Sequence, residues 1–217
     1  STALVVGAGG LGSAVSVYLA TAGVGRIVVV DGDVVEVSNL NRQILHWQED
    51  LGRPKAASAA DTLRGLNPEV EVEAVPLFAD EDNLEELVAG SDAVVDALDN
   101  FDTRHLLNGS ALAAGVPLFH GAISGLDGQA TTIVPGMTPC LRCIFPRPPP
   151  KEQVPALGAT CGVIGSIQAT EVVKHLTGLG ASLAGRLLLW DGYRGRCDEI
   201  PLERNPGCPD CGRGREL

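Results

Sequence analysis

The sequence has few basic residues. It holds 16 Lys and Arg against 27 Asp and Glu, which gives a net charge of −11 over 217 residues. Binding to a nucleic-acid backbone needs clustered Lys and Arg, so this composition argues against a nucleic-acid partner. It leaves ATP open, because a triphosphate needs only a few local cations and backbone amides. An acidic, well-solvated surface accounts for the excess of carboxylates.

Long apolar runs are also missing. No run reaches the roughly 18 residues that a membrane-spanning helix requires, so we expect no membrane partner. The chain opens on an apolar strand and a glycine turn, TALVVGAGG, without the pattern of a signal peptide. Six cysteines are too few for a disulfide scaffold in a chain of this size. Four of them form C-x-x-C pairs, which favours metal binding in a reducing compartment, and we expect a cytoplasmic protein.

Strand-like and helix-like segments alternate over the first 115 residues. The predicted strands are 3–6, 26–31, 70–75 and 92–100. The predicted helices are 11–22, 54–66, 83–88 and 103–115. This alternation is typical of a doubly wound, mostly parallel sheet with helices on both faces.

The second half of the chain follows a different pattern. PLFHGAIS and GQATTIV have no helix between them and should pair antiparallel across the GLDG turn. A proline-rich loop at 145–155 precedes a last long helix at 162–178 and a terminal strand pair, RLLLWDG and CDEIPL. We therefore expect an α/β, Rossmann-like single domain over 1–217. Its nucleotide-binding half would be 1–115, and its C-terminal half, 116–217, would continue the sheet with antiparallel strands.

The turn after the first strand reads GAGGLG and matches G-x-G-x-x-G at Gly7, Gly9 and Gly12. A strand before it and a helix after it are the context that this motif requires. The glycines let the backbone approach a phosphate, and the helix start supplies amide donors. Asp31 follows at about 20 residues, at the end of the next strand, where a ribose hydroxyl would be bound. These features fit NAD, but any nucleotide with ribose and phosphate suits the same geometry.

Charged groups further along the chain are not those of a hydride-transfer site. Arg42 lies in the loop after the second strand, and Lys55 opens the next long helix. Asp96 and Asp99 end a later strand and are followed by Asn100. The first, second and fourth strands could bring their C-terminal ends to one crevice, where the cations would neutralise a polyphosphate and a carboxylate would hold Mg²⁺. This composition favours nucleotidyl transfer from ATP over nicotinamide chemistry.

Two cysteine pairs repeat one spacing, in PCLRC and GCPDC. Paired C-x-x-C knuckles beside turn residues suit a tetrahedral Cys₄ zinc site, which would be structural because no coordination position is left open. A redox C-x-x-C and two unrelated pairs are the alternatives. The expected ligands are Cys140, Cys143, Cys208 and Cys211.

Two further cysteines stand apart from these pairs. Cys197 lies in an alternating strand pattern, and we expect it in the core. Cys161 precedes the helix expected to begin near Gly162, and a helix N-terminus can lower the pKa of a thiol and favour a nucleophilic thiolate. A small buried residue is the alternative for Cys161. No ligand spacing, and hence no metal role, is found for the four histidines: His46, His105, His120 and His175.

With these motifs the chain resembles the ThiF/MoeB/HesA family, the prokaryotic relatives of ubiquitin-activating enzymes. The matching segments follow one another through nearly the whole chain: GAGGLGS, VVVDGDVVEVSNLNRQILH, GRPKA, LNP, DALDNFDTRHLLN, PCLRC, GVIGSIQATE and NPGCPDC. The resemblance implies ATP-dependent adenylation of the C-terminal glycine of a ubiquitin-like sulfur-carrier protein ending in Gly-Gly, with release of pyrophosphate. It also implies a homodimer.

The resemblance gives each matched residue a role. Asp31 would bind the ribose, and Asp99 would coordinate Mg²⁺. Asn39, Arg42, Gln43 and Lys55 would hold the ATP phosphates, and Arg42 would stabilise the pyrophosphate as it leaves. The expected catalytic residues are Arg42, Lys55 and Asp99. The nucleotide-binding residues implied by the resemblance are Gly9, Gly10, Gly12, Asp31, Asp33, Asn39, Arg42, Gln43, Lys55, Asp99, Asn100 and Arg104.

Two features depart from the family pattern. Relatives carry a helical segment before the first strand, with an Arg that reaches the partner subunit's ATP, whereas this sequence begins at the strand, as a trimmed chain would. Many relatives also have a longer stretch, often with a cysteine, where this chain has only ALGATC, so no thioester role can be read across to Cys161. The competing hypotheses are an NAD-dependent oxidoreductase, a non-catalytic scaffold that binds nucleotide or a ubiquitin-like protein, and adenylation of a small carboxylic acid.

Overall fold

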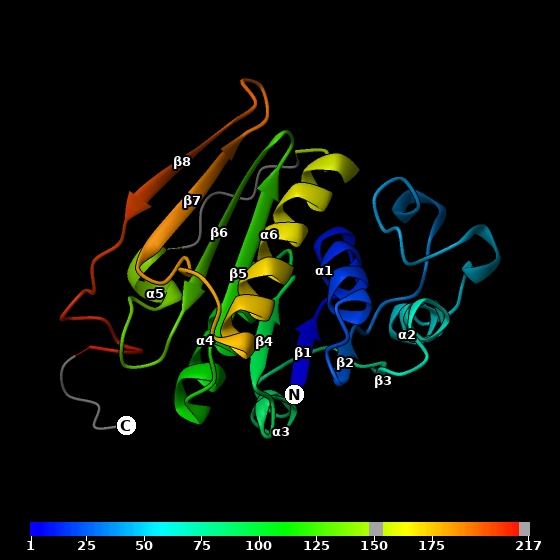
Figure 1. The fold of residues 1–217 in the computed structure, drawn as a ribbon, viewed down its shortest axis with the longest axis horizontal. Helices are drawn as coiled ribbons and strands as arrows, with labels where there is room; N and C mark the ends of the chain where they lie inside the picture. Colours follow the sequence, from blue (N-terminus) through cyan, green and yellow to red (C-terminus); the bar gives the residue numbers. More distant parts are fainter. Residues whose placement is uncertain (148–153, 213–217) are drawn as a thin grey trace.

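The computed structural model describes residues 1–147 and 154–212 (Figure 1). The strands are β1 (Thr2–Val6), β2 (Arg26–Val30), β3 (Glu71–Val75), β4 (Ala93–Asp96), β5 (Leu118–Ser124), β6 (Asp127–Ile133), β7 (Arg186–Asp191) and β8 (Arg196–Pro201). They form one sheet in the order β3-β2-β1-β4-β5-β6-β7-β8. The strands from β3 to β5 in this order pair parallel, and β6, β7 and β8 join antiparallel. The Rossmann-like sheet with antiparallel C-terminal strands is therefore confirmed.

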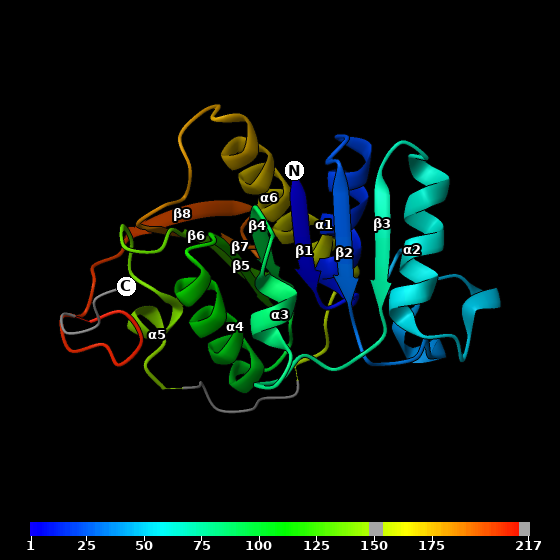
Figure 2. The ribbon, with the colours of Figure 1, turned by 90° about the horizontal axis from the view of Figure 1, so that it is seen from below.

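Helices cover both faces of the central strands. They are α1 (Gly10–Thr21), α2 (Lys55–Leu66), α3 (Leu84–Val88), α4 (Phe101–Ala114), α5 (Leu141–Ile144) and α6 (Gly158–Thr177), with short 3₁₀ turns at Val37–Asn39 and Gln48–Asp50. One apolar cluster lies beneath α1, α2 and α6, and a second lies beneath α3, α4 and α5. Figure 2 shows α6 on one side of the strands and α3, α4 and α5 on the other. Burial on both faces explains why β1, β2 and β4 are nearly continuous apolar runs.

The last strand lies outside this cover. All residues of β8 are exposed, and β8 is the outermost strand of the sheet. The prediction that Cys197 lies in the core is therefore wrong, because the thiol belongs to this exposed strand. An alternating pattern identifies a strand but does not tell whether both of its faces are covered.

The long helix begins earlier than predicted, at Gly158 rather than near Gly162, so Cys161 lies in its first turn. Residues 148–153 of the predicted proline-rich loop fall outside the described residues. In the described part of the chain, no helix has both the length and the apolar character needed to cross a bilayer.

Candidate nucleotide site and cysteine cluster

Three strand ends meet at one edge of the sheet. β1 lies between β2 and β4, all three parallel, so the segments after Val6, Val30 and Asp96 leave the sheet side by side. These segments are the glycine loop, the Asp31–Gln43 loop and the turn that carries Asp99. The chain connections diverge at this edge, and such a point is the usual ligand position in sheets of this kind.

Two positions of the glycine loop have no room for a side chain. Gly7 has a φ of +105°, and a Cβ built on it would lie 2.6 Å from the carbonyl oxygen of Ala97. A Cβ on Gly12 would collide with the Gly7 backbone. The loop therefore packs against the turn after β4. Helix α1 follows the loop directly, with Gly9 as its N-cap residue and no side-chain hydrogen bond to its first amides. Those amides are available to an anion.

Asp31 links the loops after β1 and β2. Its Oδ2 accepts a hydrogen bond from the Ala8 amide at 2.7 Å, and its Oδ1 accepts one from the Asp33 amide at 2.9 Å. A carboxylate offers about four lone-pair directions, so two acceptor positions are left for a ligand hydroxyl. Asp31 is therefore both a support of the glycine loop and a candidate ribose ligand.

The loop after β2 brings polar side chains to the glycine loop. Asn39 is buried, and its Oδ1 accepts from the Glu36 amide at 3.1 Å. Gln43 is 4% exposed, and its Oε1 finds no hydrogen-bond partner among the described residues. Its Nε2 would lie 3.8 Å from a Cβ built on Gly9. An unpaired buried oxygen beside the loop fits a ligand with a hydrogen-bond donor.

Two predicted phosphate ligands, Arg42 and Lys55, lie at the same edge but in different surroundings. Arg42 is half-buried and donates to the Ser38 carbonyl at 2.8 Å and to Asn41 Oδ1 at 2.9 Å. Lys55 opens α2, is 6% exposed, and pairs with the half-exposed carboxylate of Asp33 at 2.9 Å. Lys55 is thus a buried cation whose compensating charge lies toward solvent.

The structure separates the two acids after β4. Asp99 is exposed, whereas Asp96 is fully buried and faces Arg104 and His120. Burial alone would raise the pKa of the Asp96 carboxyl, but the charge of Arg104 and the hydrogen bond from His120 hold that pKa below its usual range. Of the two acids, only Asp99 is placed to reach a metal ion at the edge.

Two other residues of the matched motif have internal partners. The Asn100 side chain caps α4 by accepting from the Thr103 amide at 2.9 Å. Arg104 is 4% exposed and donates to the carbonyls of Leu98 and, at 3.0 Å, Gly121. Both residues therefore hold the turn that presents Asp99.

Two buried histidines contact the segments of this edge, although the sequence pattern gives them no metal role. His46 Nδ1 lies 2.8 Å from Ser58 Oγ, and its Nε2 lies 3.0 Å from the Ala8 carbonyl, so the ring joins α2 to the glycine loop. His120 contacts Asp96 at 2.7 Å. Burial lowers the pKa of both histidines, which keeps them neutral. Only a three-dimensional contact reveals these roles, because their partners lie far away in the sequence.

Cys161 lies behind the glycine loop. The residue is 2% exposed, and its sulfur would lie 2.5 Å from a Cβ built on Gly10. Burial raises the pKa of the thiol more than the nearby charge of Arg42 lowers it. Burial and the raised pKa of Cys161 thus favour the alternative of a small buried side chain over a nucleophilic thiolate.

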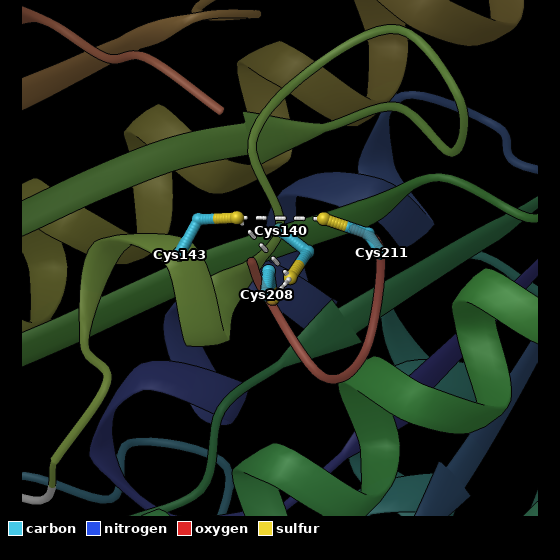
Figure 3. Close-up of side chains that lie close together, drawn as sticks. All are labelled: Cys140, Cys143, Cys208 and Cys211. Atoms are coloured by element: carbon cyan, nitrogen blue, oxygen red, sulfur yellow. Dashed lines mark hydrogen bonds between the residues drawn. The ribbon is translucent and has the colours of Figure 1, made fainter. Parts of the chain in front are cut away.

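The four knuckle cysteines converge although 68 positions separate the two pairs (Figure 3). Their sulfurs all lie within 4.8 Å of one another, with Cys140 to Cys208 at 3.5 Å and Cys143 to Cys211 at 3.4 Å. Tetrahedral zinc with Zn–S bonds of about 2.3 Å places sulfurs roughly 3.8 Å apart. Burial and the neighbouring thiols raise the pKa of Cys140, so four thiolates at this spacing need a cation. The set fits a structural metal site.

The two knuckles are also joined by polar contacts. Arg142 Nε donates to Asp210 Oδ2 at 2.9 Å, and Asn108 Nδ2 donates to the same oxygen at 3.2 Å. Asn108 Oδ1 accepts from the Leu141 amide at 2.9 Å. The cluster therefore fastens the C-terminal segment to α5 and to α4, the helix that begins beside Asp99.

The sheet and its ligand edge place the chain among the Rossmann-like nucleotide-binding proteins. Within that class, comparison of the sequence with known families identifies one family. Residues 1–210 match the model of the ThiF family, and the chain belongs to this family.

Several relatives cover almost the whole chain. The SAMP-activating enzyme E1 of Haloferax volcanii is 52% identical over 220 residues, which are 99% of this chain and 81% of that protein. The sulfur carrier protein adenylyltransferase of Thermus thermophilus is 47% identical over 223 residues, 98% of this chain and 82% of that protein. These relatives place the chain in the adenylyltransferase class of enzymes.

Solved structures share the fold. A crystal structure of E. coli MccB with ATP superposes with a TM-score of 0.86 and 26% identity, covering 98% of this chain and 67% of that one. E. coli MccB with MccA-N7isoASN gives a TM-score of 0.89 at 24% identity, which shows the fold alone.

Proposed function

We propose that this protein uses ATP and Mg²⁺ to adenylate the C-terminal glycine carboxylate of a small ubiquitin-like sulfur-carrier protein ending in Gly-Gly, releasing pyrophosphate. One observation carries the proposal. A glycine loop, two cationic side chains and an exposed carboxylate leave the sheet at the same edge, on strands β1, β2 and β4 and the helix α2 that follows. The names of the sulfur-carrier and SAMP relatives support the choice of acceptor.

The nucleoside end of ATP would lie along the glycine loop. Gly9, Gly10 and Gly12 let the backbone approach, and the first amides of α1 would face the phosphates. Asp31 keeps two acceptor positions free for the ribose hydroxyls. The unpaired Oε1 of Gln43 offers a further acceptor beside Gly9.

The phosphate end would be held by cations. Arg42, Lys55 and the Asn39 amide would contact the phosphates, and the Lys55 ammonium already pairs with the Asp33 carboxylate at 2.9 Å. Asp99 would hold Mg²⁺, which when bound neutralises phosphate oxygens. Asn100 and Arg104 support the turn on which Asp99 lies.

The chemical step needs charge stabilisation more than proton transfer. A C-terminal carboxylate is already ionised at pH 7, so no general base is required. The attacking carboxylate and the α-phosphate are both negative, and Arg42 and Lys55 would offset that repulsion and stabilise the departing pyrophosphate. This role explains why an arginine follows the ribose-binding acid in the loop after β2.

The remaining parts of the proposal concern assembly. One Zn²⁺ would be held by Cys140, Cys143, Cys208 and Cys211 as a structural ion. The protein would act in the cytoplasm as a homodimer, as the family resemblance implies.

Pyrophosphate exchange tests the function. Purified protein with ATP, Mg²⁺ and a Gly-Gly-ending carrier protein should incorporate labelled pyrophosphate into ATP, and omission of the carrier should abolish the signal. Direct titration should show binding of Mg-ATP and none of NAD. ATP binding without exchange would favour the scaffold, exchange driven only by a small carboxylic acid would change the acceptor, and tighter binding of NAD would overturn the proposal.

A further inference from the structure

The peptide groups of Leu98, the residue before Asp99, are held from both sides. The Leu98 amide donates to Asp96 Oδ1 at 3.1 Å. The Leu98 carbonyl accepts from Arg104 Nη2. Arg104 Nε lies 3.4 Å from the same Asp96 oxygen, so one acid and one arginine close a ring around a single residue.

A neutral histidine completes this ring. His120 is fully buried on β5, and its Nδ1 lies 2.7 Å from Asp96 Oδ2. The ionised carboxylate only accepts, so Nδ1 carries the proton, and Nε2 is left to accept from Gln129 Nε2 at 3.3 Å. Asp96 then carries one negative charge and Arg104 one positive charge. His120 donates its single ring N–H to the Asp96 carboxylate and thereby orients it.

The ring is sealed from water and tied to the core. The Phe145 ring packs on His120 at 5.8 Å and on Phe101 at 5.6 Å, and the Arg104 guanidinium lies 5.2 Å from the Phe101 ring centre. From the other face of the sheet, Gln168 Nε2 donates to the Asp96 carbonyl at 2.9 Å. Asp96, Arg104 and His120 each have a charged or polar partner in this buried network, and loss of such a partner would carry a large desolvation cost, which favours one geometry.

We propose that Asp96, Arg104 and His120 are positioning residues that fix the Leu98 peptide and so hold the Asp99 carboxylate in place for Mg²⁺. We call these three residues the Leu98 clamp. In this proposal the clamp acts through the turn that carries Asp99, because its contacts to that turn are made at the Leu98 peptide. This role rests on the proposed function, in which Asp99 binds the metal ion.

The test compares three variants. His120→Leu removes the N–H to Asp96 at similar volume, and His120→Asn keeps a donor at the position of Nδ1. Thr131→Val is the matched control. Thr131 lies opposite His120 in the β5–β6 register, and the variant loses a part-buried hydrogen bond to the Arg186 carbonyl, away from Leu98.

We expect His120→Leu to raise the Mg²⁺ concentration needed for half-maximal pyrophosphate exchange by about tenfold. This is the lower end of the effects seen when a residue that supports a metal ligand is replaced. ATP binding in EDTA should stay unchanged, His120→Asn should restore most of the Mg²⁺ affinity, and Thr131→Val should lower only the Tm. If His120→Leu does no more than Thr131→Val, the clamp is only structural and the proposal is overturned.

A second readout needs no ligand. Hydrogen exchange of the Leu98 amide, which donates to Asp96 Oδ1, should be slow in the free wild type and in Thr131→Val, and faster in His120→Leu. Where His120→Leu does not fold, Arg104→Lys keeps a cation near Asp96 but removes Nη2, which donates to both the Leu98 and Gly121 carbonyls, and it should show the same faster hydrogen exchange. If hydrogen exchange of the Leu98 amide is unchanged in these variants, the clamp is overturned. If the wild-type protein binds no Mg-ATP, the proposed function is overturned instead.

Discussion

The sulfur of Cys161 fills the space beside Gly10. A Cβ built on Gly10 would lie 2.5 Å from Cys161 Sγ, 3.2 Å from Cys161 Cβ and 3.6 Å from Arg42 Cγ. The first turn of α6, the start of α1 and a predicted phosphate ligand thus share one packed contact. Cys161 and Arg42 therefore both border the glycine loop at Gly10.

A double-mutant cycle tests this contact. Gly10→Ala should weaken ATP binding on the order of tenfold, because overpacking of this size costs about 1–3 kcal/mol and shifts the loop. Adding Cys161→Ala removes the sulfur and leaves only the 3.2 Å approach to its Cβ, so the double variant should recover most of the affinity. Calorimetric titration with ATP measures all four proteins. Identical losses in Gly10→Ala with and without Cys161 would contradict the contact.

Cys161 should be dispensable for adenylate formation. Its thiol is buried and its pKa is raised, so it is a poor nucleophile. Cys161→Ala should leave carrier-dependent pyrophosphate exchange nearly unchanged, and native-state alkylation should label exposed Cys197 much faster than Cys161. A folded Cys161→Ala protein without exchange activity would move this thiol into the reaction.

The cysteine cluster should bind one Zn²⁺ per chain. Cys208→Ser should lose the metal and lower the Tm, because the ion joins the C-terminal segment to α5 across a long stretch of chain. Cys197→Ser is the control, since Cys197 is exposed on β8 and outside the cluster. Metal analysis of freshly purified, unchelated protein together with thermal unfolding decides the matter. Absence of zinc from the wild type would refute the site.

Acidification should destabilise the fold near the pKa of histidine. Burial lowers the pKa of His46, His105 and His120 below the ordinary value of 6.5. The unfolded chain takes up these protons as the pH falls through 6.5 while the folded chain resists them, so this stability is present above pH 6.5 and is lost below it. Urea unfolding at pH 7.5 and 5.5 should show the loss, and His46→Gln should reduce it.

Local patterns predicted much of the architecture. The apolar runs of β1, β2 and β4 are buried on both faces and so have the composition of central parallel strands. The repeated C-x-x-C spacing is enough to group the four cysteines, because each pair supplies two of the four sulfur ligands of a tetrahedral metal site and so requires a second pair. The segments that meet at one edge of the sheet are predictable for a different reason: each follows directly after a parallel strand.

Contacts between distant segments were not predictable in this way. The pairing of Asp96 with His120 joins β4 to β5, and nothing in the local sequence distinguishes this buried acid from the exposed Asp99. The start of α6 was missed because its N-cap, Leu157, makes no side-chain cap. Cys197 was misplaced because its alternating pattern gives no information on the outermost position of β8.

Asp99 should be indispensable for the chemical step but not for the fold. It is exposed in the turn after β4, so its removal leaves no buried partner unpaired, and the Tm of Asp99→Ala should match that of the wild type. Exchange activity should nevertheless disappear, because the ion that neutralises the phosphates loses its carboxylate ligand. Asp102→Ala removes an equal charge from an exposed position in the first turn of α4 and should retain exchange. Equal losses in the two variants would mean that local negative charge, rather than metal coordination by Asp99, supports the reaction.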